Sequence, residues 1–450
     1  MKDSIFKAYD IRGIYPTDLN EEIIYAIGQA FVEIEKPKTV VMGRDVRISG
    51  PSMQEALIQG LLDSGVDVVD IGLISTEEFY FATAYYKYDA GIAITASHNP
   101  REYTGIKMVR KGAGPIAGEE ITVTLKEKSK EFFGKKVMAK KKGSLTTKDV
   151  VEDFRKFVLG FIDVKKIKPF KIVANPNFGF QGKLVQAVCR DLPITWSFLN
   201  GEPDGTFPKG RPDPFLLENR TEFIEKIKKE KPDFGVAWDA DADRVFFATG
   251  SGLFLEAYYT NTLLIEEILH KNPDGKIVYD PRYTWAILDM VEKYGGTPVR
   301  CRVGHSFIKK AMRESNALFC GESSGHTYFR DFYYADSGII PFLLMIQFLS
   351  QNKESLEELI LPIIEKYPIS GETSLTLKDA KNALSVLKEK YADRGRMEEF
   401  DNIIVEKGRE WRFNVRTSNT EPLLRINIEA KNKALIEELR SEILSLLKDL

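Results

Sequence analysis

One serine stands in a setting that suits covalent chemistry. Ser97 lies in the stretch Thr95 to Pro100, directly after the apolar run Ala90 to Ile94, which predicts a buried strand. Loops just beyond strand ends are where α/β proteins place their chemistry. A hydroxyl there, beside the imidazole of His98, could carry a phosphoryl group. The alternative is a turn in which the hydroxyl bonds its own backbone, as is common for an isolated Ser-His-Asn.

Three aspartates at alternate positions form a second candidate site. Asp239, Asp241 and Asp243 come soon after the apolar run Phe234 to Ala237. Their mutual repulsion would be costly without a cation, and Mg²⁺ prefers oxygen ligands and completes its shell with phosphate or water. An EF-hand loop is a poor match, because neither its glycine nor its final glutamate is present. The pattern therefore predicts a magnesium site rather than a solvated acidic turn.

A third loop, near the C-terminus, suits a phosphate dianion. Arg416 can donate two parallel hydrogen bonds, and Ser418, Asn419 and Thr420 add further donors. These residue types also occur in ordinary hairpins, so a plain turn is an equal alternative.

Other polar groups lie in comparable places. Glu322 and Ser324 offer groups of the kind that bind vicinal sugar hydroxyls, although loop polarity alone would explain them. Near a phosphorylated serine, a cation would meet a charge of about −1.5 to −2. Two cations and one imidazole are candidates for the site or for the surface: Arg12 before a glycine turn, Lys107, and His305 after a predicted strand.

The elements that carry these loops repeat one plan three times. Each unit opens with a strand, continues with a helix and a second strand, and then delivers a third strand with a polar loop after it. The second and third units both open with Lys-Ile-Val-x-[Asn/Asp]-Pro, at Lys171 and Lys276. The repeat predicts three related α/β units whose strand ends face one central cleft.

After Pro368 the pattern changes to a smaller α+β segment that ends in a helix over Ala434 to Leu447. The predicted fold class is therefore α/β, with three related α/β units and a C-terminal α+β domain. The predicted domains are 1–145 with the serine loop, 146–251 with the aspartate loop, 252–367 with the Glu322 loop, and 368–450 with the Arg416 loop.

Composition restricts the class of partner. The chain has 450 residues, enough for about three domains. Its 64 Lys and Arg against 66 Asp and Glu give a formal charge of −2, so no large field favours nucleic acid or a membrane. Three widely spaced cysteines indicate a reducing cytoplasm. The apolar run Ile339 to Leu349 is too short to span a bilayer and predicts a core helix.

Six stretches, in order along nearly the whole chain, resemble the motifs of the α-D-phosphohexomutase family, and within it the phosphomannomutase/phosphoglucomutase group. Any one of them could be accidental, but six in family order are highly specific. They are Tyr9 to Gly13, Thr95 to Pro100, Asp239 to Arg244, Val303 to His305, Gly321 to His326, and Arg416 to Thr420.

The resemblance implies four domains, three of them with a mixed sheet between helices. It implies that Ser97 becomes a phosphoserine and that Mg²⁺ is held by a phosphoserine oxygen with Asp239, Asp241 and Asp243. It implies that two residues contact the sugar hydroxyls, Glu322 and Ser324. It implies that four residues contact the substrate phosphate: Arg416, Ser418, Asn419 and Thr420. Further matched positions are Tyr9, Arg12, Lys107, Arg244, His305 and His326.

The implied reaction passes a phosphoryl group from Ser97 to a hexose 1-phosphate and back, through a glucose or mannose 1,6-bisphosphate that also acts as activator. We expect Lys107 and His326, both in loops expected at the cleft, to serve as general base and acid, with His98 as the alternative; the sequence does not decide which is the base and which the acid. The expected partners are sugar phosphates, with no nucleic acid or membrane, in a monomer or homodimer.

Departures from the family pattern bear mainly on the sugar. Ser323 stands where methionine or glutamine is common, and Arg282 where a lysine is expected. Ala240 and Ala242 replace frequent glycines, which is tolerable only if neither needs a positive φ. The alternatives are a phosphoglucosamine mutase, a non-catalytic sugar-phosphate-binding protein, and a phosphatase that hydrolyses the phosphoserine.

Overall fold

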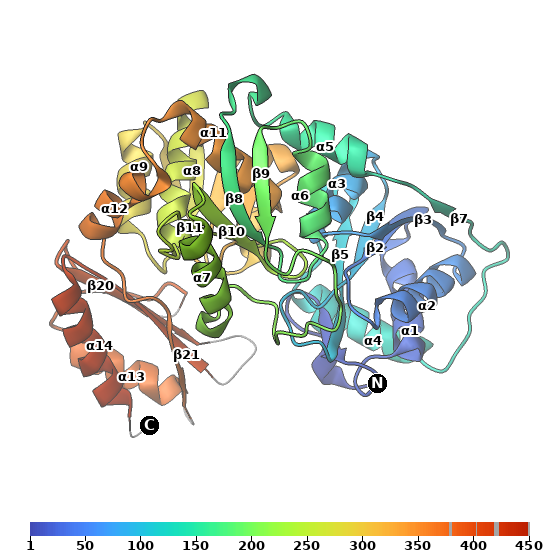
Figure 1. Ribbon diagram of the computed structural model, residues 1–450. Helices are drawn as coiled ribbons and strands as arrows, with labels where there is room; N and C mark the ends of the chain where they lie inside the picture. The colour runs from blue at the N-terminus through green and yellow to red at the C-terminus, as the bar shows by residue number, and fades with distance from the viewer. Residues whose placement is uncertain (378–379, 402, 418–422, 449–450) are drawn as a thin grey trace. The chain divides into compact units, whose positions relative to one another are not determined.

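The computed structural model of the protein describes residues 1–377, 380–401, 403–417 and 423–448. Three residues expected in the phosphate loop, Ser418, Asn419 and Thr420, lie outside the described residues. The chain forms two compact units, traced by residue number in Figure 1. The first unit contains residues 1–254 and 324–353, and the second contains 255–323 and 354–450.

The first sheet of the first unit combines parallel and antiparallel strands. Three parallel strands lie in the order β3-β2-β4, β5 runs antiparallel to β4, and β1 and β7 lie at the two edges. The strands are β1 (Ile11–Ile14), β2 (Thr39–Arg44), β3 (Asp67–Leu73), β4 (Ala90–Ile94), β5 (Tyr103–Arg110), β6 (Gly114–Pro115) and β7 (Leu145–Thr147).

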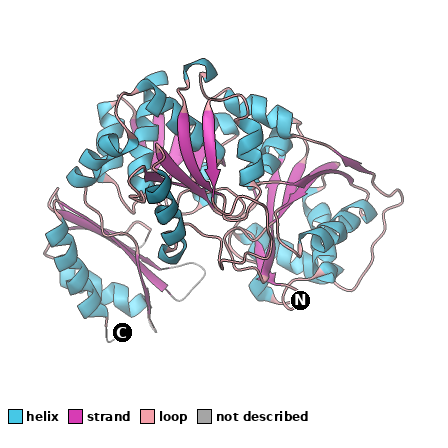
Figure 2. Cartoon of the chain, in the orientation of Figure 1, coloured by secondary structure: helices cyan, strands magenta, loops and turns pink. Residues whose placement is uncertain are grey.

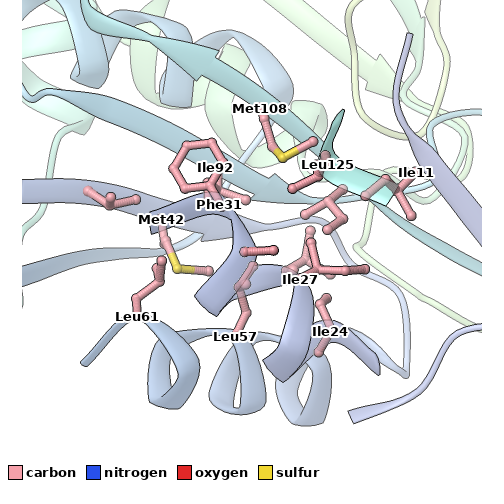
Figure 3. Packing of buried hydrophobic residues seen from close by; sticks show 14 of the residues in the cluster. Ile11, Ile24, Ile27, Phe31, Met42, Leu57, Leu61, Ile92, Met108 and Leu125 are labelled. Atoms are coloured by element: carbon pink, nitrogen blue, oxygen red, sulfur yellow. The ribbon is translucent and has the colours of Figure 1, made fainter. Parts of the chain in front are cut away.

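Helices α1 and α2 cover one face of this sheet. The helices of this part are α1 (Glu21–Glu35), α2 (Gly50–Asp63), α3 (Thr76–Tyr85) and α4 (Lys126–Phe132). Figure 3 shows Ile24, Ile27 and Leu57 from the helices beside Met42 and Ile92 from the strands. These side chains are almost fully buried, and each contributes about 1.5–3 kcal/mol by leaving water. This core fixes the strands whose ends carry the polar loops.

A second sheet in the same unit repeats this arrangement. Its order is β9-β8-β10-β11, with three parallel strands and an antiparallel fourth, as in β3-β2-β4-β5. The strands are β8 (Phe170–Asn175), β9 (Ile194–Phe198), β10 (Phe234–Trp238) and β11 (Val245–Thr249). The helices that accompany them are α5 (Val151–Leu159), α6 (Gln181–Val188) and α7 (Thr221–Glu230).

The first unit also takes a segment from late in the chain. This segment contains β15 (Thr327–Phe329), β16 (Ala335–Asp336) and α11 (Ile339–Gln351). Side chains from Ile339 to Leu349 are buried, so the predicted core helix is confirmed. Among the described residues, no helix combines the length and apolar character needed to cross a membrane.

The second unit opens with the third repeat. Its parallel strands lie in the order β13-β12-β14, which matches β3-β2-β4 and β9-β8-β10 and confirms the three related α/β units. The elements are β12 (Lys276–Tyr279), β13 (Thr297–Arg300), β14 (Phe319–Gly321), α8 (Ala257–Lys271), α9 (Trp285–Lys293), α10 (His305–Ser315) and α12 (Leu356–Lys366).

The C-terminal part of the second unit is an antiparallel sheet in the order β17-β21-β20-β19-β18, with α13 and α14 on one face, as Figures 1 and 2 show. Its elements are β17 (Thr373–Thr376), β18 (Arg396–Glu398), β19 (Ile403–Lys407), β20 (Trp411–Thr417), β21 (Leu423–Ala430), α13 (Ala380–Tyr391) and α14 (Lys433–Leu447). Apolar side chains of the sheet and of α14 form its core. This α+β domain agrees with the predicted C-terminal segment.

All three cysteines are free and buried. Cys189 lies in the first unit, and Cys301 and Cys320 lie in the second. Burial raises the pKa of each thiol.

Candidate active site

The predicted nucleophile lies on a strained turn. Ser97 is 2% exposed and adopts a φ of +51° just beyond β4, which is buried along its whole length. The left-handed conformation costs a non-glycine residue about 1–2 kcal/mol. The Ser97 hydroxyl donates to Asp239 Oδ2 at 3.2 Å and lies 3.1 Å from His98 Nδ1. The backbone strain thus accompanies a hydroxyl aimed at the aspartate loop.

The three aspartates lie together in the turn between β10 and β11. All three are buried, and one oxygen of each lies within 4.8 Å of the others. Burial, with the charges of Asp243 and Asp241, raises the pKa of Asp239 well above its ordinary range. Separately, Asp241 Oδ1 is buried and accepts no hydrogen bond from the described residues. A hard-oxygen set with an unused buried acceptor fits Mg²⁺.

Threonines hold the other oxygen of Asp241. The Thr76 hydroxyl, at the start of α3, donates to Asp241 Oδ2 at 2.7 Å, and the Thr95 hydroxyl does so at 3.3 Å. Thr95 Oγ1 also accepts from Ser97 N at 2.9 Å. Thr95 therefore joins the serine loop to the aspartate loop through one side chain.

The expectation about the alanines of the aspartate loop is wrong at one position. Ala242 has a φ of +58°, so the loop does require a left-handed residue there. The Cβ of Ala242 makes this conformation costly, and a glycine would adopt it freely. Ala240 is not among the non-glycine residues with positive φ in the described chain.

Lys107 lies inside β5, and not in a loop as we expected. It pairs with Ala93 of β4, and its ammonium donates to Asp241 Oδ2 at 2.6 Å and to Asp243 Oδ2. Burial opposes its charge, but Asp241 and Asp243 outweigh burial and raise the pKa of Lys107 above its ordinary value. The side chain is therefore an ammonium that partly neutralises the aspartates.

Arg12 also belongs to a strand, since it lies within β1 and pairs with Gly105 of β5. Its Nε donates to Asp10 Oδ2 at 2.7 Å. Its Nη1 donates to Ala96 O at 3.2 Å and to Asn99 Oδ1. The guanidinium therefore lies against the serine loop.

Arg244 and His326 complete the group in the first unit. Arg244 Nε donates to His326 Nε2 at 3.3 Å, and His326 Nε2 also lies 3.3 Å from Asp243 Oδ1. His326 Nδ1 lies 3.1 Å from the Ser324 hydroxyl. A ring that accepts from Arg244 at Nε2 carries its proton at Nδ1, which then donates to Ser324.

Burial lowers the pKa of His98 well below its ordinary range, and the charge of Arg244 adds to this effect. The imidazole beside Ser97 is therefore neutral.

Tyr9 lies half-buried just before β1.

The second unit holds a separate set of predicted residues. Glu322 is buried and accepts from Arg282 Nη2 at 2.9 Å, while Asp280 accepts from two nitrogens of the same guanidinium. Arg416, at the end of β20, donates to Glu372 at 3.3 Å. His305 is the first residue of α10 rather than part of a strand-end loop.

Comparison with known proteins agrees with this arrangement. Models of the phosphoglucomutase/phosphomannomutase family match in order: alpha/beta/alpha domain I over residues 3–132, domain II over 151–252, domain III over 257–367, and the C-terminal domain over 375–446. The chain belongs to the phosphoglucomutase/phosphomannomutase family. It is therefore an enzyme with the general mutase activity of that family, and the predicted fold class and family are confirmed.

Relatives match over nearly their full length. The chain is 43% identical over 444 residues to a protein of Xanthomonas campestris named phosphohexose mutases, with 98% of each chain covered. It is 40% identical over 448 residues to a phosphomannomutase of Escherichia coli K12, again with 98% of each covered. A family protein from Burkholderia thailandensis has a solved structure that is 30% identical, with a TM-score of 0.89 and coverage of 100% of this chain and 98% of that one.

Reasoning from the sequence missed three contributors to this phosphoglucomutase/phosphomannomutase site. Thr95 stood in the serine stretch but had no assigned role, Thr76 lies in a capping box at the start of α3, and Arg47 follows β2. The Ser-x-x-Glu pattern before α3 could have located the helix terminus. No local signal marks Arg47, because the carbonyls to which it donates lie about 50 residues further along the chain.

Proposed function

We propose that the enzyme interconverts the 1-phosphates and 6-phosphates of hexoses, mannose and/or glucose, through a phosphoserine at Ser97 and a 1,6-bisphosphate intermediate. One observation carries this proposal: a buried serine hydroxyl contacts a buried cluster of three carboxylates that fits a divalent cation. A nucleophile and a cation site in contact are the parts that phosphoryl transfer needs.

In the first half-reaction, the 6-hydroxyl of a hexose 1-phosphate attacks the phosphorus on Ser97. The bond between Ser97 Oγ and phosphorus breaks, and a bond between the sugar oxygen and phosphorus forms. The hydroxyl proton passes to a base, and the free serine recovers a proton from an acid. The bisphosphate then returns its other phosphoryl group to Ser97, which leaves the hexose 6-phosphate.

Asp239, Asp241 and Asp243, with a phosphoserine oxygen, are the proposed ligands of Mg²⁺, which supplies charge neutralisation for the transferring group when bound. Arg12, which contacts the serine loop, and Arg244 add positive charge on the protein side. Fixed charges of this kind need no reorganisation during transfer.

The hydrogen bonds suggest how the two proton-transfer roles divide. The proton on Lys107 is stabilised by Asp241 and Asp243, so we assign Lys107 the acid role in the first half-reaction. His326 Nε2 carries a lone pair, which accepts from Arg244 in this structure, and we assign His326 the base role, in which the substrate hydroxyl replaces Arg244 as the donor. His98 is neutral and contacts Ser97, so it remains the alternative base.

Eight residues are proposed to bind the sugar phosphate. Glu322 and Ser324 accept or donate hydrogen bonds at sugar hydroxyls, and Tyr9 and His305 are assigned to substrate binding by their family positions. The phosphate not being transferred is assigned to the C-terminal loop: Arg416, Ser418, Asn419 and Thr420. Arg416 Nε is buried and donates no hydrogen bond to the described residues, which leaves a donor for that phosphate.

A neutral hexose is favoured over glucosamine. Arg282 donates to Glu322, one of the groups proposed to bind the sugar. A guanidinium at that oxygen disfavours a second cation nearby. Phosphoglucosamine is therefore the alternative substrate and not the leading one.

Phosphorus NMR tests the proposal with Mg²⁺, a trace of glucose 1,6-bisphosphate, and three substrates in parallel. We expect mannose 1-phosphate and glucose 1-phosphate to become 6-phosphates, and glucosamine 1-phosphate to react more slowly. Ser97→Ala should lower turnover at least about 1,000-fold, because it removes the nucleophile. Ser52→Ala, a matched change in α2, should retain activity.

Other outcomes would replace the proposal. Free phosphate released as fast as the sugar reacts would identify a phosphatase. No conversion of any sugar by protein shown by intact mass to be phosphorylated on Ser97 would favour the binding-protein alternative. Faster conversion of glucosamine 1-phosphate would move the enzyme to the amino-sugar branch.

A further inference from the structure

Arg47 is a charged side chain buried beneath the serine loop. Its exposure is 1%, and that of its partner Asp45 is 2%. Asp45 accepts from the backbone N of Arg47 at 2.9 Å and from its Nε at 3.2 Å. The pair neutralises the buried charge and turns the rest of the guanidinium toward the loop.

The remaining nitrogens of Arg47 donate to four backbone carbonyls of one short segment. Nη2 donates to Ser97 O and Asn99 O, both at 2.7 Å. Nη1 donates to Pro100 O at 2.7 Å and to Tyr103 O at 3.0 Å. With the bond from Nε to Asp45, each of the five N–H donors of the guanidinium has an acceptor. A single planar group thus spans the serine loop from the nucleophile to the start of β5.

The other side of the guanidinium is closed by the segment between β9 and α7. The Phe207 ring centroid lies 5.1 Å from the Arg47 guanidinium carbon. Gly205 forms a parallel bridge with Arg47, and a Cβ at Gly205 would approach Val46 O to 2.0 Å. Arg211 Nε donates to His98 O at 3.0 Å. This segment therefore contacts Arg47 through Gly205 and Phe207, and it contacts the serine loop through the side chain of Arg211.

These contacts act where the backbone is strained. Ser97 adopts its left-handed φ only because its surroundings over-determine it, as such conformations require. Arg47 bonds the carbonyl of this same residue, while the Ser97 hydroxyl is directed to Asp239. The guanidinium thus holds the main chain of the residue whose hydroxyl contacts Asp239.

We propose that Arg47 is a positioning residue that holds the serine loop in its transfer geometry throughout the catalytic cycle. This inference rests on the proposed function, because it assigns Arg47 to the phosphoryl transfer at Ser97. A loop held by main-chain bonds keeps its geometry whether Ser97 is free or phosphorylated, which a mutase needs in both half-reactions.

Arg47→Lys tests the proposal, since it keeps the charge but cannot span four carbonyls. We expect kcat to fall on the order of 100-fold, because small misplacement of reacting groups has that effect. We expect KM for the hexose phosphate to stay within about threefold, because Arg47 makes no proposed contact with substrate. Arg220→Lys is the matched control: Arg220 is also buried and donates to the carbonyls of Pro214 and Phe215, and we expect its kcat to be unchanged.

Hydrogen exchange measured by mass spectrometry supplies a readout independent of activity. We expect faster exchange over 95–103 in Arg47→Lys than in the wild type, with Arg220→Lys like the wild type. If Arg47→Lys does not fold, Phe207→Leu removes the ring over the guanidinium and should lower kcat severalfold, about 3- to 10-fold, at unchanged KM.

Unchanged kcat and unchanged exchange in the folded Arg47→Lys variant would overturn the proposal. A rise in KM with kcat retained would also overturn it, since that would place Arg47 in substrate binding. The proposed function has its own test in the wild-type protein. It would be contradicted if the wild type neither converted hexose phosphates nor carried phosphate on Ser97.

Discussion

At the scale of single residues, two non-glycine residues with positive φ lie in the two loops that meet at the proposed reaction centre: Ser97 and Ala242. Strained backbone of this kind concentrates at functional sites, where the surrounding structure maintains it. The proposed reaction uses the side chain of Ser97, so the strain there accompanies the proposed function. Ala242 has no such need, and its strain should be removable.

Ala242→Gly should therefore raise the free energy of unfolding, or leave it unchanged, because relief of about 1 kcal/mol of strain offsets the greater freedom of glycine in the unfolded chain. Ala240→Gly is the matched control, two residues away and without positive φ, and should lower it by about 0.5–1 kcal/mol. Denaturant unfolding in the absence of Mg²⁺ measures both. Equal destabilisation by the two changes would contradict the inference that the positive φ of Ala242 strains the folded protein.

Lys107→Met should separate stability from metal affinity. Without the ammonium, Asp241 and Asp243 keep their buried charge unpaired, so the metal-free protein should lose about 3–5 kcal/mol of its free energy of unfolding. The same loss of a competing cation should tighten Mg²⁺ binding, measurable by calorimetric titration, while turnover falls. Lys111→Met, at an exposed position nearby, should change none of these quantities. Weaker Mg²⁺ binding in Lys107→Met would mean that the lysine supports the cation site.

At the scale of elements, the start of α3 couples a helix cap to the cation site. Ser75 and Glu78 form a capping box, and the next residue, Thr76, donates to Asp241. Burial, with the charge of Glu77, raises the pKa of Glu78 from 4.5 to about 8. The folded protein therefore holds this proton more tightly than the unfolded chain. Its stabilising contribution is fully present below about pH 4.5 and is lost as pH rises through about 8.

Glu78→Gln should flatten this dependence, because glutamine can keep the cap without titrating. Between pH 5 and 8, the free energy of unfolding should decrease in both proteins. We expect the decrease in the variant to be smaller than that in the wild type, by on the order of 3 kcal/mol. Glu358→Gln is the control, since Glu358 forms an equivalent capping box with Ser355 at α12 but its pKa is lowered there. A slope unchanged by Glu78→Gln would mean that Glu78 is ionised in the folded protein.

The strand pair β20-β21 places two guanidiniums on one carboxylate. Arg416 and Arg425 face each other across the strands, and Glu372 lies 3.3 Å from the first and 3.6 Å from the second. A substrate phosphate bound by Arg416 must compete with this carboxylate. Glu372→Gln should therefore lower KM for the hexose phosphate about two- to fivefold, an effect within the range of partly exposed ion pairs. An increase in KM would show that Glu372 orients Arg416 instead.

At the scale of the whole molecule, local patterns predicted the repeat well. The run Ala90 to Ile94 forms β4 and the run Phe234 to Ala237 forms most of β10, because continuous apolar residues followed by a polar loop leave little choice. Arg12 and Lys107 were placed in turns or loops, because a charged residue in a short strand breaks the apolar pattern. Their strands are set by pairing with each other, which no local window contains.

The same limit applies to the site. The proposed nucleophile and the three aspartates stand out because they follow apolar strands, but Thr76 reaches Asp241 across 165 positions of sequence. Contacts at such separations depend on how the sheets and helices pack. The positive φ of Ala242 likewise belongs to the folded turn and leaves no mark in the residue type.

The two compact units predict how Mg²⁺ acts on unfolding. The three aspartates all lie in the first unit, so Mg²⁺ should stabilise that unit, by about 2.7 kcal/mol at a concentration 100 times its Kd. Calorimetry should show a transition that moves to lower temperature with a chelator and is insensitive to it in Asp241→Asn. A chelator effect that persists in Asp241→Asn would place the stabilising cation elsewhere.

The three cysteines are natural probes of the order in which the two units unfold. Thiols react with alkylating reagents only as solvent-accessible thiolates. Cys189 reports on the first unit, and Cys301 and Cys320 report on the second. A brief pulse of reagent at increasing denaturant, followed by peptide mass spectrometry, would show which unit opens first without any introduced label. The order of modification would also show whether the units open together or one at a time.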